Sequence, residues 1–199
     1  MSEIEKRELG NTGIEVTKIG VGLWAIGGGE WGEVKDRESL NMIDAALEMG
    51  INFFDTADVY GDGHSEELLG QSMKGRREEF IVATKIGWRG FDGDKGASQY
   101  DTVEKLIEVV ESNLKRLQTD YVDLIQCHID FKEPDMDVFV EGFQNLKEQG
   151  KVRAYGLSTS DFDYLQAFNA DGETDTLQID YSILNRTPEK KIFPYIMEN

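Results

Sequence analysis

The chain has 199 residues and a formal net charge of −18, with 39 acidic residues against 21 basic ones. This length suits one domain with a sizeable core, so we expect residues 1–199 to form a single domain. The acidic balance argues against a nucleic-acid partner, and no apolar run approaches the roughly 20 residues that span a membrane. The single cysteine, Cys127, excludes an internal disulfide and, with a charged N-terminus unlike a signal peptide, predicts a cytoplasmic protein.

The chain begins with a predicted β-hairpin at residues 5–20, whose strands flank Gly10–Gly13, a stretch that tolerates positive φ. From residue 19 onward, short apolar runs alternate with segments whose apolar residues recur at the period of a helix. The predicted strands are residues 19–24, 51–54, 80–84, 121–127, 152–157 and 176–180. The helices between them are expected to begin at the capping residues Asp36, His64 or Ser65, Asp101 with Glu104, Asp135, Ser160 with Asp163, and Thr187 before Pro188.

This alternation predicts an α/β fold with a parallel sheet and right-handed crossovers. Two architectures compete, the doubly wound sheet and the (β/α)8 TIM barrel. A doubly wound dinucleotide domain should carry G-x-G-x-x-G after its first strand, and Gly27, Gly28 and Gly29 lack that spacing. We therefore expect a (β/α)8 barrel with an N-terminal hairpin, of which the chain holds about six of eight βα units.

A polar or aromatic residue follows each predicted strand, where a barrel builds its active site. These residues are Trp24, Asp55, Lys85, His128, Ser158, and Gln178 with Tyr181, and Tyr60 lies just beyond Asp55. A lone aspartate would more often cap a turn, and a lone lysine would more often lie on the surface. Asp55, Lys85 and His128 at successive strand ends, with Tyr60 nearby, instead predict one catalytic site formed by these four residues.

The chemistry of these four groups suits proton donation to an oxygen that gains negative charge. A free phenol is a poor acid at neutral pH, but a neighbouring ammonium favours the phenolate, and Asp55 can keep Lys85 charged. His128 can hydrogen-bond a substrate oxygen, as when a carbonyl becomes an alcohol. Two histidines and one cysteine give no zinc spacing, so no metal is expected, and a nicotinamide is the simplest hydride donor.

Several stretches resemble the aldo-keto reductase superfamily. DTADVYG is similar to its Asp-Tyr signature, ATKIG to its lysine motif and LIQCHID to its histidine motif. LGNTGIEVTKIGVGLWAIGG and LQIDYSILNR resemble the first and sixth strands of the branch that contains bacterial oxidoreductases and potassium-channel β subunits. The resemblance implies a barrel enzyme that reduces aldehydes or ketones, with Tyr60 as the general acid. Lys85 would make Tyr60 a stronger acid, Asp55 would support Lys85, and His128 would orient the carbonyl.

The same resemblance implies NADPH, or in some members NADH, at the mouth of the barrel. The implied cofactor-binding residues are Gly22, Trp24, Asp55, Ser158, Thr159, Gln178 and Tyr181, with Tyr181 stacked on the nicotinamide. Trp88 and Arg89 would shape the substrate side. The chain departs from the family at Ser158-Thr159, where Ser-Asn or Ser-Arg is usual.

A second departure is that the family's strands 7 and 8, which hold the cofactor phosphates, are not in this sequence. We therefore expect a fragment or a truncated gene product that binds NADPH weakly and self-associates through exposed barrel edges. Three alternatives stay open: a nucleotide-responsive regulatory subunit, a catalytically inactive truncated form, and a Schiff-base lyase that uses Lys85.

Overall fold

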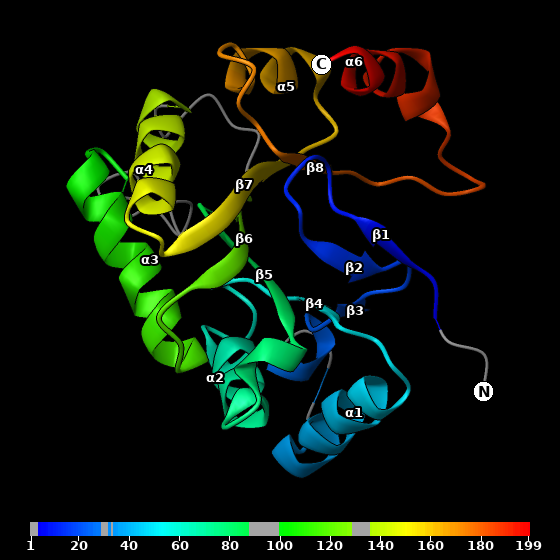
Figure 1. The fold of residues 1–199 in the computed structure, drawn as a ribbon, viewed down its shortest axis with the longest axis vertical. Coiled ribbons are helices and arrows are strands. Elements are labelled where there is room, and N and C mark those ends of the chain that lie inside the picture. The colour runs from blue at the N-terminus through cyan, green and yellow to red at the C-terminus, as the bar shows by residue number, and fades with distance from the viewer. Residues whose placement is uncertain (1–3, 29–31, 33, 88–99, 129–135) are drawn as a thin grey trace.

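The computed structural model describes residues 4–28, 32, 34–87, 100–128 and 136–199. The predicted hairpin is confirmed: β1 (Lys6–Glu8) pairs antiparallel with β2 (Glu15–Thr17). Gly10 and Gly13, in the turn between them, have φ of 57° and 72°, which other residues rarely adopt. The hairpin lies inside the curve of the larger sheet (Figure 1).

The described residues form one larger sheet of six parallel strands, which follow each other in chain order. The strands are β3 (Val21–Gly22), β4 (Phe53–Asp55), β5 (Ile81–Ile86), β6 (Val122–Cys127), β7 (Val152–Ser158) and β8 (Thr176–Gln178). The sheet curls, with the helices outside it (Figure 1). This is the strand order of a parallel barrel, as the alternating pattern predicted, with β3 and β8 at the two edges.

The helices between these strands also match the predicted segments. They are α1 (Asp36–Glu48), α2 (His64–Met73), α3 (Val103–Leu117), α4 (Met136–Glu148), α5 (Phe162–Phe168) and α6 (Ile192–Glu198). Short 3-10 turns occur at η1 (Ala25–Gly27), η3 (Arg77–Glu79) and η6 (Thr187–Lys190). In α3, Leu106, Val110 and Leu117 are fully buried, which confirms the predicted apolar face of that helix.

The predicted N-cap residues are wrong at every helix start for which the structure describes the N-cap, by one residue at α3 and α5. Thr102, not Asp101, caps α3, because its extended backbone lets the hydroxyl accept from the Lys105 amide. Asp161, not Ser160, caps α5 by accepting from the Tyr164 amide at 2.8 Å.

The other helix starts differ in the same way. Asp36 is already helical in α1, and Lys35 is the N-cap. His64 is already helical in α2, and the N-cap is Gly63, whose φ of 93° suits glycine. Arg186, rather than Thr187, precedes η6, and α6 begins only after Lys191. Asp135 lies outside the described residues.

Two hydrophobic layers hold the sheet. The larger one lies between the sheet and the outer helices and contains the rings of Phe54, Phe80, Phe139 and Phe143. The smaller one joins Ile14 and Val16 of the hairpin to Ala83, Leu124 and Ala154 of the sheet. The hairpin therefore covers the concave side of the sheet with apolar residues.

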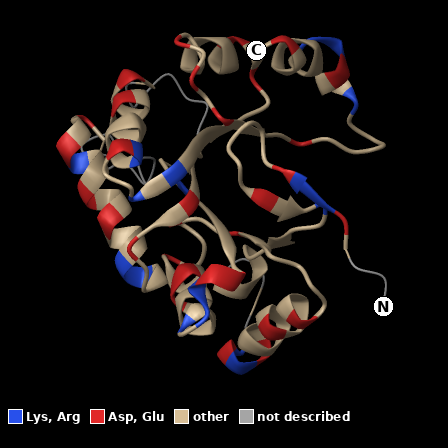
Figure 2. Ribbon diagram, viewed as in Figure 1, with Lys and Arg blue, Asp and Glu red and all other residues tan. Residues whose placement is uncertain are grey.

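Charged residues are spread over the helices rather than gathered in one segment (Figure 2). Helix α3 carries three glutamates together with two lysines and one arginine, which is typical of a solvated helix surface. Among the described residues, no helix has both the length and the apolar character that crossing a bilayer requires.

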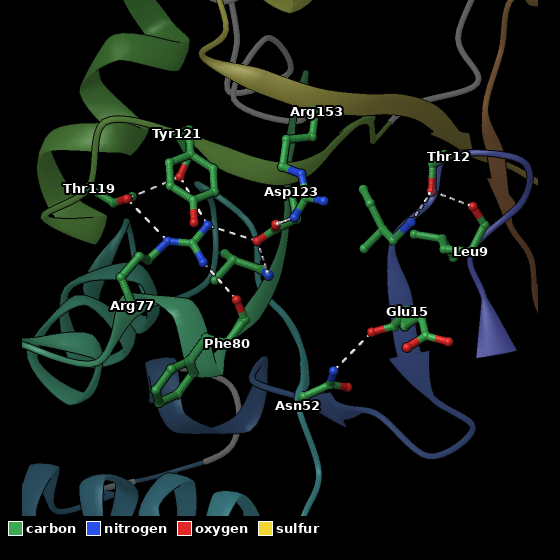
Figure 3. A network of polar contacts seen from close by, with 12 residues as sticks. Leu9, Thr12, Glu15, Asn52, Arg77, Phe80, Thr119, Tyr121, Asp123 and Arg153 are labelled. Atoms are coloured by element: carbon green, nitrogen blue, oxygen red, sulfur yellow. Dashed lines mark hydrogen bonds and ion pairs between the residues drawn. The ribbon is translucent and has the colours of Figure 1, made fainter. Parts of the chain in front are cut away.

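A buried carboxylate, Asp123, connects three segments near the start of β6 (Figure 3). It accepts from Arg77 at 2.7 Å, from Arg153 at 2.6 Å and from the Val82 amide at 2.9 Å. Arg77 also donates to the carbonyl oxygen of Phe80 at 2.7 Å. These contacts fix β5, β6 and β7 relative to each other at the end opposite to the predicted site.

We predict that Asp123→Ala lowers the free energy of unfolding by about 3 kcal/mol, because it leaves Arg77 and the Val82 amide without their buried acceptor. Asp120→Ala, in the exposed turn before β6, should change it by less than about 0.5 kcal/mol. Guanidinium denaturation followed by circular dichroism measures both values. Equal stability of the two variants would contradict the assigned role of Asp123.

Candidate active site

Asp55 and Lys85 meet at the ends of two neighbouring strands. In the parallel pairing of β4 with β5, Asp55 lies opposite Ala83. Lys85 is two residues farther along β5, so it points to the same face of the sheet as Ala83. The Lys85 ammonium therefore reaches the Asp55 carboxylate, and Nζ lies 2.7 Å from Oδ2.

The Lys85 ammonium makes three contacts in a dry environment, since the residue is only 1% exposed. Besides Asp55, Nζ donates to the carbonyl oxygen of Thr56 at 2.9 Å and to the Tyr60 hydroxyl at 3.2 Å. An ammonium has three hydrogens, so these contacts use all of them. The phenol oxygen of Tyr60 accepts this bond, which leaves its own hydrogen free for another acceptor.

Two aromatic side chains pack against Tyr60. Trp24, two residues after β3, stacks on it with ring centroids 5.9 Å apart and an interplanar angle of 22°. His128, just after β6, meets it edge-on with centroids 5.8 Å apart. The His128 amide also donates to the carbonyl oxygen of Ile86 at 2.9 Å, which places the ring beside β5. The four predicted catalytic residues are thus brought together.

Burial of His128, and secondarily the positive charge of Lys85, lower its pKa to about 3. The imidazole is therefore neutral at physiological pH and keeps one N–H and one lone pair. Cys127 points to the opposite face, with Sγ 3.9 Å from the Tyr164 hydroxyl in the outer core.

The predicted cofactor residues divide into two groups. Ser158 pairs with Gln178 across β7 and β8, and the Thr159 amide donates to the carbonyl oxygen of Gln178 at 3.1 Å. A hollow on the concave side of the sheet is lined in part by Gly22, Asp55 and Gln178. Gln178 thus connects Ser158 and Thr159 to the hollow that Gly22 and Asp55 also line.

Tyr181 lies apart from this group. Its ring packs edge-on against Phe193 with centroids 4.8 Å apart, and its hydroxyl donates to Glu189 at 2.6 Å. This hydrogen bond raises the pKa of Tyr181. The predicted stacking position of Tyr181 stays a prediction. Trp88 and Arg89 lie outside the described residues.

Sequence reasoning missed two residues of this region. Gln126, a polar residue within an apolar strand, donates from Nε2 to Oε1 of Gln178 at 3.3 Å and so leaves the amide hydrogens of Gln178 available. Its polarity within β6 was the available signal. Thr56 contributes a backbone carbonyl to Lys85, which its residue type could not reveal.

Comparison with known proteins agrees with this geometry. The model of the Aldo/keto reductase family matches residues 18–199. Aldo-keto reductase YhdN of Bacillus subtilis is 37% identical over 98% of the chain, and the NADH-specific methylglyoxal reductase of Escherichia coli is 35% identical over 98%. The structure is similar to that of aldo-keto reductase AKR11C1 from Bacillus halodurans in its holo form, with a TM-score of 0.84 and 33% identity, over 98% of this chain and 63% of that one.

The fold is therefore an incomplete (β/α)8 barrel, as predicted. The chain belongs to the aldo/keto reductase family. It spans 59% of the length of the Bacillus subtilis relative and 64% of that of the Escherichia coli relative. Its relatives also include a probable voltage-gated potassium channel subunit beta of Arabidopsis thaliana, which confirms the branch indicated by the motifs.

The two histidines of the chain should have clearly different pKa values. The His64 pKa is raised above its usual value, chiefly by a hydrogen bond to Asp36, whereas that of His128 is about 3. An NMR titration of the imidazole nitrogens should show His64 becoming charged first as pH falls. In Lys85→Met, the pKa of His128 should rise but stay below about 6.5, because burial remains.

This difference carries a stability consequence with a definite sign. Between about 3 and about 6.5, the unfolded chain binds a proton at His128 that the folded chain does not. The contribution of His128 to stability is thus complete above this window and is lost as pH falls through it. A His128 resonance that titrates near pH 6.5 in the folded protein would contradict the buried placement.

Proposed function

We propose that the protein is a nicotinamide-dependent oxidoreductase that reduces small aldehydes or ketones to alcohols, with Tyr60 as the proton donor. The observation that carries the proposal is the Lys85 ammonium, which contacts both the Asp55 carboxylate and the Tyr60 hydroxyl. Membership of the aldo/keto reductase family supports the same reaction class.

The proton transfer follows from the charges at Lys85. As the substrate oxygen gains negative charge, the free hydrogen of the Tyr60 hydroxyl passes to it, and a phenolate remains. The Lys85 ammonium, 3.2 Å from the phenol oxygen, stabilises that phenolate and so favours the transfer. Asp55 holds the ammonium in its charged form at the same time.

His128 has a different role in this proposal. Because its pKa is about 3, it is neutral at physiological pH and does not compete with Tyr60 as a cationic acid. Its ring lies against the Tyr60 ring with the centroids 5.8 Å apart, so a carbonyl oxygen beside the phenol is also near the imidazole. His128 therefore orients the carbonyl by hydrogen bonding.

A nicotinamide cofactor, when bound, would supply the hydride that adds to the carbonyl carbon. Ser158, Thr159 and Gln178 suit its carboxamide, which needs both donors and acceptors. Ser158 carries a hydroxyl, the Thr159 hydroxyl accepts from the Asp161 amide at 3.0 Å, and Gln178 keeps its amide hydrogens. Asp55 Oδ1 is buried without a hydrogen-bond partner among the described residues, so it can accept from a ligand. Gly22, Trp24 and Tyr181 complete the proposed site. We propose NADPH as the cofactor, with NADH as the alternative.

Other uses of the same fold are less well supported. A Schiff-base mechanism needs a neutral Lys85 amine, whereas its Nζ donates to three oxygens, one of them a carboxylate. A regulatory subunit would need only to bind the cofactor. Cofactor binding alone does not require Tyr60, Lys85 and His128 to lie together. The single-domain organisation, the cytoplasmic location and self-association through the edges β3 and β8 stay predictions.

Tyr60→Phe tests the proposal, because it removes the transferred hydrogen and little else. NADPH oxidation in the presence of a small aldehyde should fall by about 1,000-fold or more, while the Kd for NADPH, measured by fluorescence, changes less than about twofold. Tyr121→Phe is the matched control, since Tyr121 packs against Arg77 away from the site, and it should keep its activity. Retained turnover in Tyr60→Phe would exclude the mechanism.

A further inference from the structure

Ser65, in the first turn of α2, is fully buried and contacts three separate segments near the candidate active site. Its hydroxyl lies 2.9 Å from the carbonyl oxygen of Leu23 and 2.9 Å from the hydroxyl of Thr56. Its backbone amide donates to the carbonyl oxygen of Tyr60 at 3.2 Å. The segments after β3 and β4 and the Tyr60 turn therefore meet at this one residue.

The directions of these hydrogen bonds are fixed by counting hydrogens. The carbonyl oxygen of Leu23 can only accept, so the single hydroxyl hydrogen of Ser65 goes to it. The Ser65 oxygen must then accept from Thr56. The result is a chain from Thr56 through Ser65 to Leu23, in which each hydroxyl has a definite orientation.

Both ends of this chain lead to the catalytic group. The carbonyl oxygen of Thr56 accepts from the Lys85 ammonium at 2.9 Å. Leu23 directly precedes Trp24, whose ring stacks on Tyr60. A shift of the Ser65 hydroxyl would therefore move a Lys85 acceptor and the ring beside Tyr60 together.

Ser65 itself is held by its neighbour in the same helical turn. Glu66 is fully buried and accepts from the Thr84 hydroxyl at 2.6 Å and from Arg116 at 2.7 Å. These bonds attach the start of α2 to β5 and α3. Ser65 thus transmits the position of a fixed element to the turn that carries Tyr60.

A tight backbone contact limits the Tyr60 turn on another side. A Cβ placed on Gly61 would lie 2.1 Å from the carbonyl oxygen of Gly27, and one on Gly27 would lie 2.6 Å from the Gly61 amide. The two loops therefore already touch, and the turn cannot move closer to η1. Its remaining freedom is movement away from Gly27, which the bond from Ser65 to the Tyr60 carbonyl opposes.

We propose that Ser65 is a positioning residue that holds Tyr60 and Lys85 at proton-transfer distance through the Thr56–Ser65–Leu23 chain. The proposal rests on the proposed function of Tyr60. In Ser65→Ala, Thr56 loses its acceptor and Leu23 its donor, so the contact between Lys85 and the Tyr60 hydroxyl becomes looser. The phenol then gains less from the ammonium, and proton transfer slows.

The experiment compares Ser65→Ala with Ser72→Ala. Ser72 lies in the same helix and is buried, and its hydroxyl has no hydrogen-bond partner among the described residues, so the same atom is removed without breaking the chain. In Ser65→Ala, kcat should fall about tenfold, while KM for the aldehyde and Kd for NADPH change less than about twofold. In Ser72→Ala, all three should stay within about twofold of the original protein.

A second readout does not depend on turnover. Carbon-13 labelling of the tyrosine rings, with Tyr60→Phe to assign the Tyr60 signal, gives the chemical shift of the Tyr60 ring carbon bonded to the hydroxyl at one fixed pH. This chemical shift responds to the hydrogen bond from Lys85, so it should change in Ser65→Ala and should not change in Ser72→Ala. A purely structural role of Ser65 would lower thermal stability without changing this chemical shift.

Thr56→Val keeps the shape of the side chain and removes the donor to Ser65, so it serves if Ser65→Ala does not fold. It should lower kcat and change the Tyr60 chemical shift in the same direction as Ser65→Ala. Equal kcat and equal Tyr60 chemical shifts in Ser65→Ala and Ser72→Ala would overturn the proposal, even when Tyr60→Phe is inactive. Full activity in Tyr60→Phe would instead remove the proposed function itself, so the two failures are distinguishable.

Discussion

A buried ammonium, Lys85, is the group on which the candidate site depends. Removing such a charge from water costs several kcal/mol, and the cost is offset only when an opposite charge and further acceptors surround it. Here Asp55 supplies the charge, and Thr56 and Tyr60 supply the other two oxygens. All three acceptors come from β4 and the turn after it, so the parallel register of β4 and β5 makes the site possible.

The same sheet carries a second buried ion cluster, around Asp123, at its other end. The two clusters differ in the groups that their central charge contacts. Asp123 accepts from two arginines and a backbone amide, and each partner is part of the protein scaffold. Lys85 instead contacts the phenol of Tyr60, whose own hydrogen remains free. The first cluster fixes the strands at their N-terminal ends, and the second uses the fixed strands to present a proton at their C-terminal ends.

Local sequence patterns predicted the strands and the proximity of Asp55, Lys85 and His128, because these three residues follow apolar runs and a parallel sheet brings strand ends together. The caps of α3 and α5 were predicted one residue away; at α3, Asp101 and Thr102 are both good caps and only backbone geometry decides between them. Ser65 had no such signal as a positioning residue. Its acceptor, Leu23, is 42 positions away and contributes only a backbone oxygen, which any residue would provide.

In the proposed mechanism, His128 orients the carbonyl and Tyr60 donates the proton, and both roles depend on a third residue. Lys85 acts on both: its charge helps to lower the pKa of His128 to about 3 and it stabilises a phenolate at Tyr60. A neutral imidazole gives up its N–H proton far less readily than a phenol beside an ammonium. In the proposed mechanism, burial together with this cation prevents His128 from acting as a cationic acid, and the same cation favours Tyr60 as the donor. Any change that moves Lys85 should therefore alter both residues at once.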